Sequence, residues 1–208
     1  MITIFIDTSN QDVSIALIKG DKVIDKLTED TNNKHSKILI PYIKDMLTKN
    51  NIEPKNINKV MVVNGPGSFT GIRIGLTVAK TIGYVLNIPV ITVSSLKILA
   101  ISCEEEIIIS IIDARNDNYY IGVYDQEKQE IEKEQFNNLE YLLKLKQKYP
   151  SSIVVANKKI QLEAIQTKVP ELNFEKIYQY YSEKTPTNIH SIKPNYLKLP
   201  QAMERKSD

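Results

Sequence analysis

GPGSFTGIRIG, residues 65–75, is the stretch that decides the fold. It follows a short apolar run at residues 59–63, whose unbroken hydrophobicity is typical of a strand buried on both faces. The residues that come after it, 72–86, are apolar almost all round a helix. The pattern therefore predicts a buried strand, a tight glycine turn and a helix that has two surfaces to bury.

The glycine turn could hold an anion, because free backbone N–H groups at a helix N-terminus bind negative charge and Ser68 and Thr70 add hydroxyl groups. A Walker phosphate loop, however, has Lys and then Ser or Thr directly after its last glycine, whereas Gly71 is followed by Ile72 and Arg73. The dinucleotide pattern GxGxxG is also absent, since Thr70 stands where the third glycine would be. A phosphate site is one interpretation of the turn, and a purely structural turn is the simpler one.

The predicted helix carries a stripe of small residues at four-residue spacing: Gly71, Gly75, Ala79 and Gly83. Each glycine inside a helix costs about 1 kcal/mol relative to alanine, so close approach of another backbone is expected to offset it. Two interpretations follow from the pattern. The stripe seats the first helix of the same chain, or one side of the helix packs on the sheet while the other binds a partner protein.

The first half of the chain predicts the element order β-β-β-α-β-α-β-α. Alternating apolar and polar residues predict strands at 2–6, 13–18 and 22–28, with a hairpin turn at Gly20-Asp21. The remaining elements are a helix from His35 that Pro41 bends or starts, the strand at 59–63, the helix at 72–86, a strand at 90–93, and a helix through Ile101 capped by Ser94 or Ser95.

The second half partly repeats this order. It predicts strands at 107–112, 119–124 and 130–136, a helix at 139–148, a strand at 153–155 and a helix at 160–169. We expect two lobes, 1–103 and 104–208. Residues 192–199 form a short extended closing segment, limited by Pro194 and Pro200.

The composition is that of an ordinary soluble globular protein, with 42% hydrophobic residues and a net charge of +2. Charge alone therefore indicates no polyanion partner. The lone Cys103 cannot form an internal disulfide, and the N-terminus lacks a basic region followed by a long apolar run. We expect a cytoplasmic protein that does not associate with membranes.

Candidate catalytic residues are few. Asp7 and Ser9 end the first strand, and Asp113 ends the first strand of the second half in the equivalent place. A carboxylate and a hydroxyl there could hold a metal-bound phosphate, although polar turn residues at a strand end are the simpler interpretation. The histidines, His35 and His190, give no metal-binding pair. We expect no metal, no cofactor and no catalytic residue, with Asp7, Ser9 and Asp113 as weak candidates for nucleotide binding.

The sequence resembles one family in particular, the bacterial TsaB proteins, also called YeaZ, of tRNA threonylcarbamoyladenosine synthesis. The resemblance covers the first half almost entirely and thins beyond Tyr124. The matching stretches are IDTSNQDVSIAL (6–17), KHSKILIPYI (34–43), VNGPGSFTGIRIGLTVAKTIGYVLNIPVITVSSLKILA (63–100), IDARNDNYYIGVY (112–124) and KPNYLK (193–198).

The resemblance implies an α/β fold with two ribonuclease H-like lobes, the architecture of actin-like, Hsp70-like and sugar-kinase-like ATPases, with a degenerate nucleotide site. The absence of glycine after Gly122 fits a lost site. The resemblance further implies a non-catalytic subunit that dimerises with the catalytic TsaD and acts with the ATPase TsaE. Such a subunit meets tRNA through that complex and self-associates when alone. The complex would transfer threonylcarbamoyl from its adenylate to the adenosine beside the anticodon. Kinship with the glycoprotease-like M22 family implies no proteolysis here.

By resemblance, the interface with TsaD is built by two helices of the first lobe, residues 35–49 and 71–86. The residues expected in this interface are His35, Leu39, Tyr42, Ile43, Gly71, Arg73, Gly75, Ala79 and Gly83. The alternative is an independent actin-like ATPase or phosphotransferase in which Asp7, Ser9 and Asp113 flank the phosphates.

Overall fold

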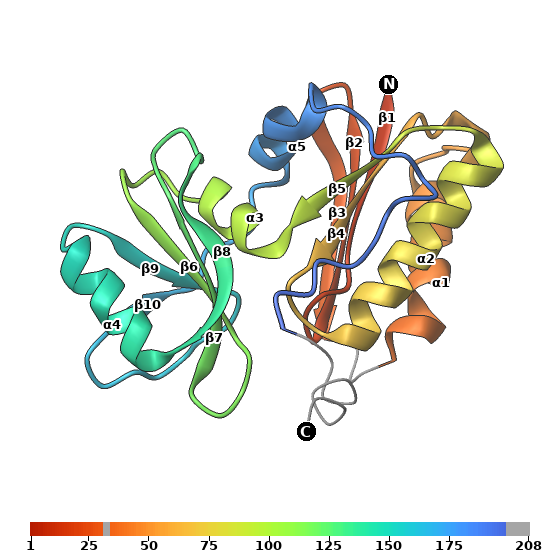
Figure 1. Ribbon diagram of the computed structural model, residues 1–208. Helices are drawn as coiled ribbons and strands as arrows, with labels where there is room; N and C mark the ends of the chain where they lie inside the picture. The colour runs from red at the N-terminus through yellow and green to blue at the C-terminus, as the bar shows by residue number, and fades with distance from the viewer. Residues whose placement is uncertain (31–33, 199–208) are drawn as a thin grey trace.

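The computed structural model describes residues 1–30 and 34–198 and shows two lobes, each built on a five-stranded sheet (Figure 1). The strand order is β3-β2-β1-β4-β5 in the first sheet and β8-β7-β6-β9-β10 in the second. In both sheets the first three strands pair antiparallel and the last two are added in parallel. The predicted two-lobed fold, with one ribonuclease H-like topology used twice, is thereby confirmed.

The strands have the following bounds. In the first sheet they are β1 (Ile2–Asp7), β2 (Asp12–Lys19), β3 (Lys22–Asp30), β4 (Lys59–Gly65) and β5 (Val90–Ser94). In the second sheet they are β6 (Ile108–Asp113), β7 (Asn118–Tyr124), β8 (Glu130–Asn138), β9 (Ile153–Ala156) and β10 (Thr167–Lys168). A short 3₁₀ helix, Pro54–Asn56, precedes β4.

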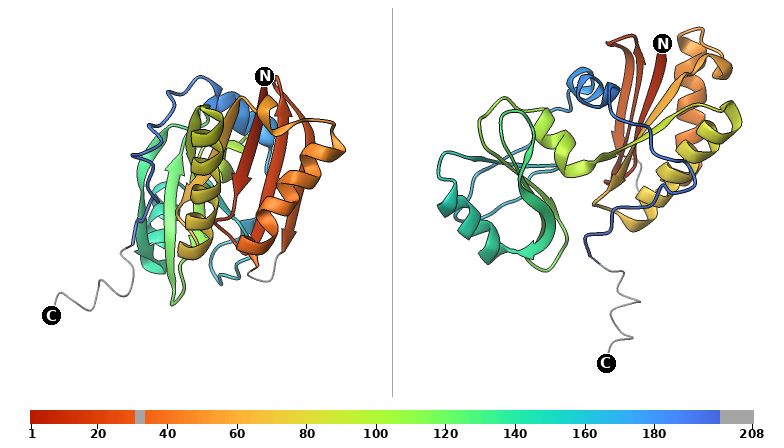
Figure 2. Two further views of the ribbon diagram at one scale, coloured as in Figure 1. Left: turned by 90° about the vertical axis from the view of Figure 1, so that its right-hand side faces the viewer. Right: turned by 45° about the horizontal axis from the view of Figure 1, so that its top comes forward.

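Helices cover both faces of the first sheet. The helices α1 (His35–Lys49) and α2 (Phe69–Leu86) lie side by side over one face (Figure 2) and share a core with Ile4 and Ile6 of β1. On the opposite face, α5 (Phe174–Ser182) packs against Phe5 of the same strand. Because successive side chains of a strand point to opposite faces, β1 contributes to both layers of this core.

A short helix, α3 (Ser95–Ile101), lies between the two sheets. Its Ile98 and Ile101 pack in the first lobe, whereas Leu96 and Leu99 pack against the second sheet. Ser94 begins this helix, since its hydroxyl oxygen accepts hydrogen bonds from the backbone of the first turn. The far face of the second sheet is covered by α4 (Leu139–Lys148). The lobes therefore share one buried helix.

The chain returns to the first lobe after the second sheet. Phe174, Ile177 and Tyr181 of α5 are buried among residues of the first sheet, and Ile192 is buried in the core that α1 and α2 share with that sheet. The simple division into 1–103 and 104–208 consequently does not describe the packing. Nor is any helix within residues 1–30 and 34–198 both long and apolar enough to span a bilayer.

The predicted elements of the first half are all present, with small shifts at their ends. The helix predicted at 160–169 is wrong. Leu162 and Ile165 pair across a turn there, and the stretch ends in β10, which pairs with β9. The helix α5 was not predicted. The described part of the closing segment, 192–198, has no regular helix or strand, and Leu199 and Pro200 lie outside the described residues.

Candidate functional site: the glycine turn and the helix pair

The glycine turn packs directly on the turn that follows β1. Thr8 Oγ1 donates to the Gly71 carbonyl at 2.7 Å, and Ser68 N–H donates to the Ser9 carbonyl at 2.7 Å. A Cβ atom on Gly71 would overlap the Thr8 carbonyl oxygen, and one on Gly67 would overlap the Ser9 carbonyl oxygen. Gly67 also has a φ of +153°, which side chains rarely tolerate. The glycines therefore let two backbone segments touch.

The N-terminal end of α2 is covered by the protein's own side chains. Ser68 is the N-cap, and its Oγ accepts a hydrogen bond from Gly71 N–H at 3.2 Å. The ring of Tyr196 lies 4.7 Å from that of Phe69, and its hydroxyl accepts a hydrogen bond from Arg73 Nε at 2.7 Å. Since a phosphate would need this helix end open, the contacts support the structural interpretation of the turn.

The two aspartates of the nucleotide-binding alternative have different surroundings. Asp7 is 2% exposed, and burial raises the pKa of its carboxyl although Ser9 N–H donates to it at 2.8 Å. Burial also acts on Asp113, but the hydrogen bond from Arg115 N–H and the Lys158 ammonium at 3.1 Å outweigh it and lower that pKa. A carboxyl whose charged form is disfavoured by burial and a carboxylate already paired are poor ligands for a metal-bound phosphate. Across the described part of the chain, no three His, Cys, Asp or Glu residues are grouped so that they could hold a metal ion.

The small-residue stripe of α2 faces inward. Gly71, Gly75, Ala79 and Gly83 are all buried. A Cβ atom on Gly75 would overlap Thr8 Oγ1, and one on Gly83 would overlap a side chain of β5. The expectation that this stripe receives a partner's helix is therefore wrong, because the first sheet and its turn already fill the groove. Gly71, Gly75 and Gly83 do not seat α1 either, because none of the atoms nearest to a Cβ at these positions belongs to that helix.

Of the other expected interface residues, three are buried and two reach the surface. His35, Leu39 and Ile43 lie in the layer between α1 and the sheet, with exposures of 6% or less. Tyr42 is half-buried, and a hydrogen bond to Glu29 raises the pKa of its hydroxyl. Arg73 is exposed at the start of α2. Tyr42 and Arg73 are thus the members of the expected set that a partner could touch.

The outward face of the helix pair carries apolar residues that sequence reasoning did not place in the interface. Ile40 of α1 is 52% exposed, and Tyr84 and Val85 of α2 are each 71% exposed. A groove of about 430 Å³ runs between the two helices, and its walls are mainly aliphatic. Its lining includes Ile40, Leu47, Ile52, Ile82, Val85 and Leu86. The signal in the sequence was Val85, which falls opposite Gly83 on the helix, where an apolar residue needs a second surface to bury it.

The fold and this face together define a two-lobed α/β protein of the actin-like class that displays an apolar helix pair. A family profile described as TsaD, tRNA N6-adenosine threonylcarbamoyltransferase, matches residues 27–188. The tRNA threonylcarbamoyladenosine biosynthesis protein TsaB of Buchnera aphidicola subsp. Acyrthosiphon pisum is 30% identical over 211 residues, which cover 98% of this chain and 86% of that protein. The chain belongs to the TsaB (YeaZ) family of tRNA threonylcarbamoyladenosine biosynthesis proteins.

Two further comparisons agree, the first of them over a shorter span. The Bacillus subtilis TsaB is 39% identical over 126 residues, and this match spans only 55% of that protein's length. The structure of YeaZ from Pseudomonas aeruginosa superposes with a TM-score of 0.75 at 21% identity, covering 94% of this chain and 99% of that one. At this level of identity the structural likeness shows the fold, which agrees with the two lobes described above.

Proposed function

We propose that the chain is a non-catalytic, activating subunit of the bacterial machinery that makes threonylcarbamoyladenosine in tRNA. In this proposal it docks on TsaD through the outward face of α1 and α2, and TsaE completes the assembly as its ATPase. The chain then meets tRNA through the complex, in the cytoplasm. The observation that carries the proposal is the exposed apolar groove between α1 and α2 in a member of the TsaB family.

The chemistry of the groove defines what it binds. Its walls are aliphatic and its edges carry Lys44, Thr48 and Thr81, so it suits an apolar element of a protein partner with polar groups around the rim. Ile40 and Val85 are more than half exposed, and burying each in an interface contributes about 1–2 kcal/mol. When TsaD is absent, the same face pairs two copies of the chain.

The non-catalytic role rests on what Asp7, Ser9 and Asp113 do in the fold. The Ser9 carbonyl supports the glycine turn, burial raises the pKa of the Asp7 carboxyl, and Asp113 is paired with Lys158. These roles are structural and leave the transfer of threonylcarbamoyl to the partner. Calorimetry with ATP tests the point, because heat of binding that disappears in Asp7→Ala would favour the independent ATPase.

Co-purification with the cognate TsaD tests the docking face. Val85→Asp places a charge in the groove, and Val169→Asp makes the same change at another exposed valine, in the segment after β10. We expect TsaD to be lost with Val85→Asp and retained with Val169→Asp. Undiminished co-purification of folded Val85→Asp would remove the assignment of this face.

A further inference from the structure

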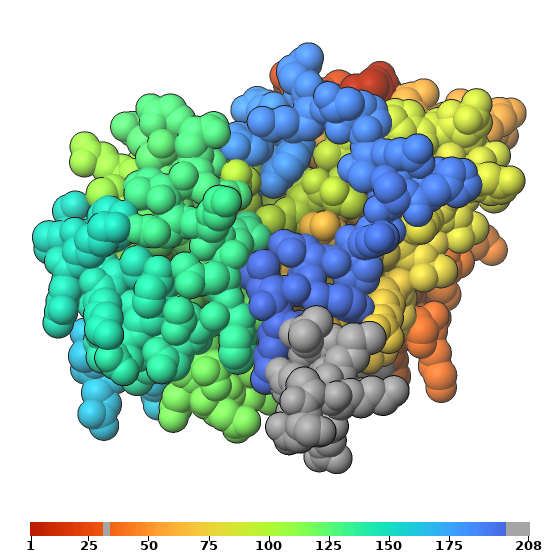
Figure 3. Space-filling view, viewed as in Figure 1, coloured from red at the N-terminus to blue at the C-terminus, as the bar shows by residue number. Residues whose placement is uncertain are grey.

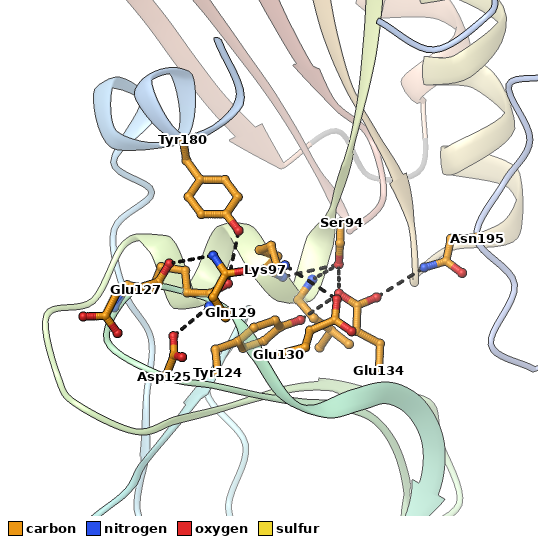
Figure 4. Close-up of polar contacts among 12 residues, drawn as sticks. Ser94, Lys97, Tyr124, Asp125, Glu127, Gln129, Glu130, Glu134, Tyr180 and Asn195 are labelled. Carbon is orange, nitrogen blue, oxygen red and sulfur yellow. Dashed lines mark hydrogen bonds and ion pairs between the residues drawn. The ribbon is translucent and has the colours of Figure 1, made fainter. Parts of the chain in front are cut away.

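A single carboxylate gathers hydrogen bonds from both lobes (Figure 4). Glu134 lies on β8 in the second lobe, and its Oε1 accepts a hydrogen bond from the Tyr124 hydroxyl of β7 at 2.7 Å. The same oxygen accepts a hydrogen bond from the Ser94 hydroxyl, at the end of β5 in the first lobe. Its Oε2 accepts a hydrogen bond from Asn195 Nδ2 at 3.2 Å. Three donors from separate parts of the chain thus converge on Glu134.

The shared helix α3 joins this cluster at two points. Ser94 Oγ accepts hydrogen bonds from Leu96 N–H at 3.2 Å and Lys97 N–H at 3.3 Å, so its own hydrogen is available for Glu134. The Lys97 ammonium lies 5.4 Å from the centre of the Tyr124 ring and 3.5 Å from Glu130 of β8. The carboxylate of Glu134 therefore sits at the end of the helix that both lobes share.

Asn195 belongs to residues 187–198, which we call the strap. The strap crosses the front of the first lobe, between the second lobe and α2 (Figure 3). At its start, Thr187 N–H donates to the Val90 carbonyl at 3.0 Å. Midway, the Lys80 ammonium of α2 donates to the Ile192 carbonyl at 3.5 Å. The strap is thus anchored to β5 and to α2.

The far end of the strap lies on the glycine turn. Asn195 N–H donates to the Asn64 carbonyl at 2.7 Å, and Asn64 Nδ2 donates to the Lys193 carbonyl at 3.4 Å. A Cβ atom on Gly65 would come within 2.9 Å of the Asn195 carbonyl oxygen, which shows how closely the two backbones approach. Asn195 consequently connects three parts: the strap, the glycine turn and, through Glu134, the second lobe.

We propose that Glu134 is a clasp that holds the strap on the glycine turn and, in doing so, fixes the orientation of the two lobes. While Glu134 accepts hydrogen bonds from Ser94 and Asn195, the second lobe, the strap and the start of α2 move as one body. When those hydrogen bonds are lost, the strap lifts from Asn64 and Arg73, and the second lobe gains freedom of rotation about α3. The clasp acts within one chain and does not depend on the proposed partner.

Hydrogen–deuterium exchange on the full chain tests the clasp. Glu134→Ala removes the acceptor, and Glu132→Ala is the matched control because Glu132, on the same strand, pairs with Lys148 and Tyr149 inside the second lobe. We expect the amides of residues 187–198 and 64–73 to exchange about tenfold faster or more in Glu134→Ala. In Glu132→Ala these amides should exchange at the wild-type rate.

The reciprocal variant, Asn195→Ala, keeps the test decisive if Glu134→Ala fails to fold. It releases the strap while leaving the Ser94 and Tyr124 hydrogen bonds in place. We expect faster exchange over 187–198, and in the double variant no further increase over Glu134→Ala, because both changes break the same contact. Wild-type exchange of the strap in folded Asn195→Ala, or independent effects that add, would overturn the clasp.

Discussion

Asp7 and Asp113 end equivalent strands of the two lobes and accept equivalent backbone hydrogen bonds, yet their carboxyl groups have opposite pKa shifts. Each accepts a hydrogen bond at 2.8 Å from the backbone N–H two residues further on, from Ser9 and Arg115 respectively. Burial raises the pKa of Asp7, whereas the Arg115 N–H and Lys158 outweigh burial at Asp113 and lower its pKa. The duplicated lobes thus share a backbone design but not its electrostatics.

Asp7→Asn is expected to stabilise the protein near neutral pH. Burial in the folded state raises the pKa of Asp7, so the protonated carboxyl stabilises the folded state relative to the charged one. This stabilisation is fully present below the ordinary pKa of 3.8 and is lost as the pH rises through the raised pKa. Asparagine keeps the acceptor for Ser9 N–H without the buried charge. Urea unfolding at several pH values should show a gain that vanishes under acid conditions. A variant less stable than wild type at neutral pH would contradict this electrostatic account.

Asp113→Asn is expected to have the opposite effect. The folded state lowers the pKa of Asp113, so the ionised carboxylate stabilises the folded state. This stabilisation is fully present above the ordinary pKa of 3.8 and is lost as the pH falls through the lowered pKa. Loss of this partly exposed pair with Lys158 should cost roughly 0.5–1 kcal/mol near neutral pH. The same urea titrations measure it, and equal responses of the two aspartate variants would show that their surroundings do not differ as described.

Gly71→Ala is expected to destabilise the protein, although alanine is the better helix former. Its Cβ would overlap the Thr8 carbonyl oxygen, so the turn and α2 must separate, at a cost of about 1–3 kcal/mol. Gly20→Ala is the control, since nothing lies within 4 Å of that position and only its φ of +67° opposes a side chain. Thermal unfolding should rank Gly71→Ala below Gly20→Ala. The reverse order would mean that the glycine turn is loosely packed.

The backbone plan could be predicted from the sequence because it depends on local patterns. Alternation in residues 2–28 indicated the antiparallel strands, and the apolar run before Gly65 indicated a strand buried on both faces. Which side of α2 the stripe of small residues faces could not be predicted, since it depends on Thr8, 63 residues from Gly71. Periodicity shows that a helix has two surfaces to bury, but not which of them the same chain covers.

The return of the chain to the first lobe could not be predicted from the sequence for a related reason. The tyrosines of α5 and the strap are held in place by residues far away in the sequence, on β1, β4, β5, β8 and α2. Ile160, Leu162 and Ile165 pack in the second core without a helix, because β10 pairs with β9. In each case, contacts between distant parts of the chain outweigh local propensity.

The docking face is tested most directly by reconstituting threonylcarbamoyl transfer to tRNA from the cognate TsaD, TsaE and this chain. We predict that transfer requires the chain, and that Val85→Asp lowers it about tenfold or more at limiting concentration, because a charge at a central apolar contact costs at least about 1.4 kcal/mol of binding. Val169→Asp should match the wild type. Full transfer without the chain, or with Val85→Asp at the same limiting concentration, would contradict the proposal that the outer face of α1 and α2 activates TsaD.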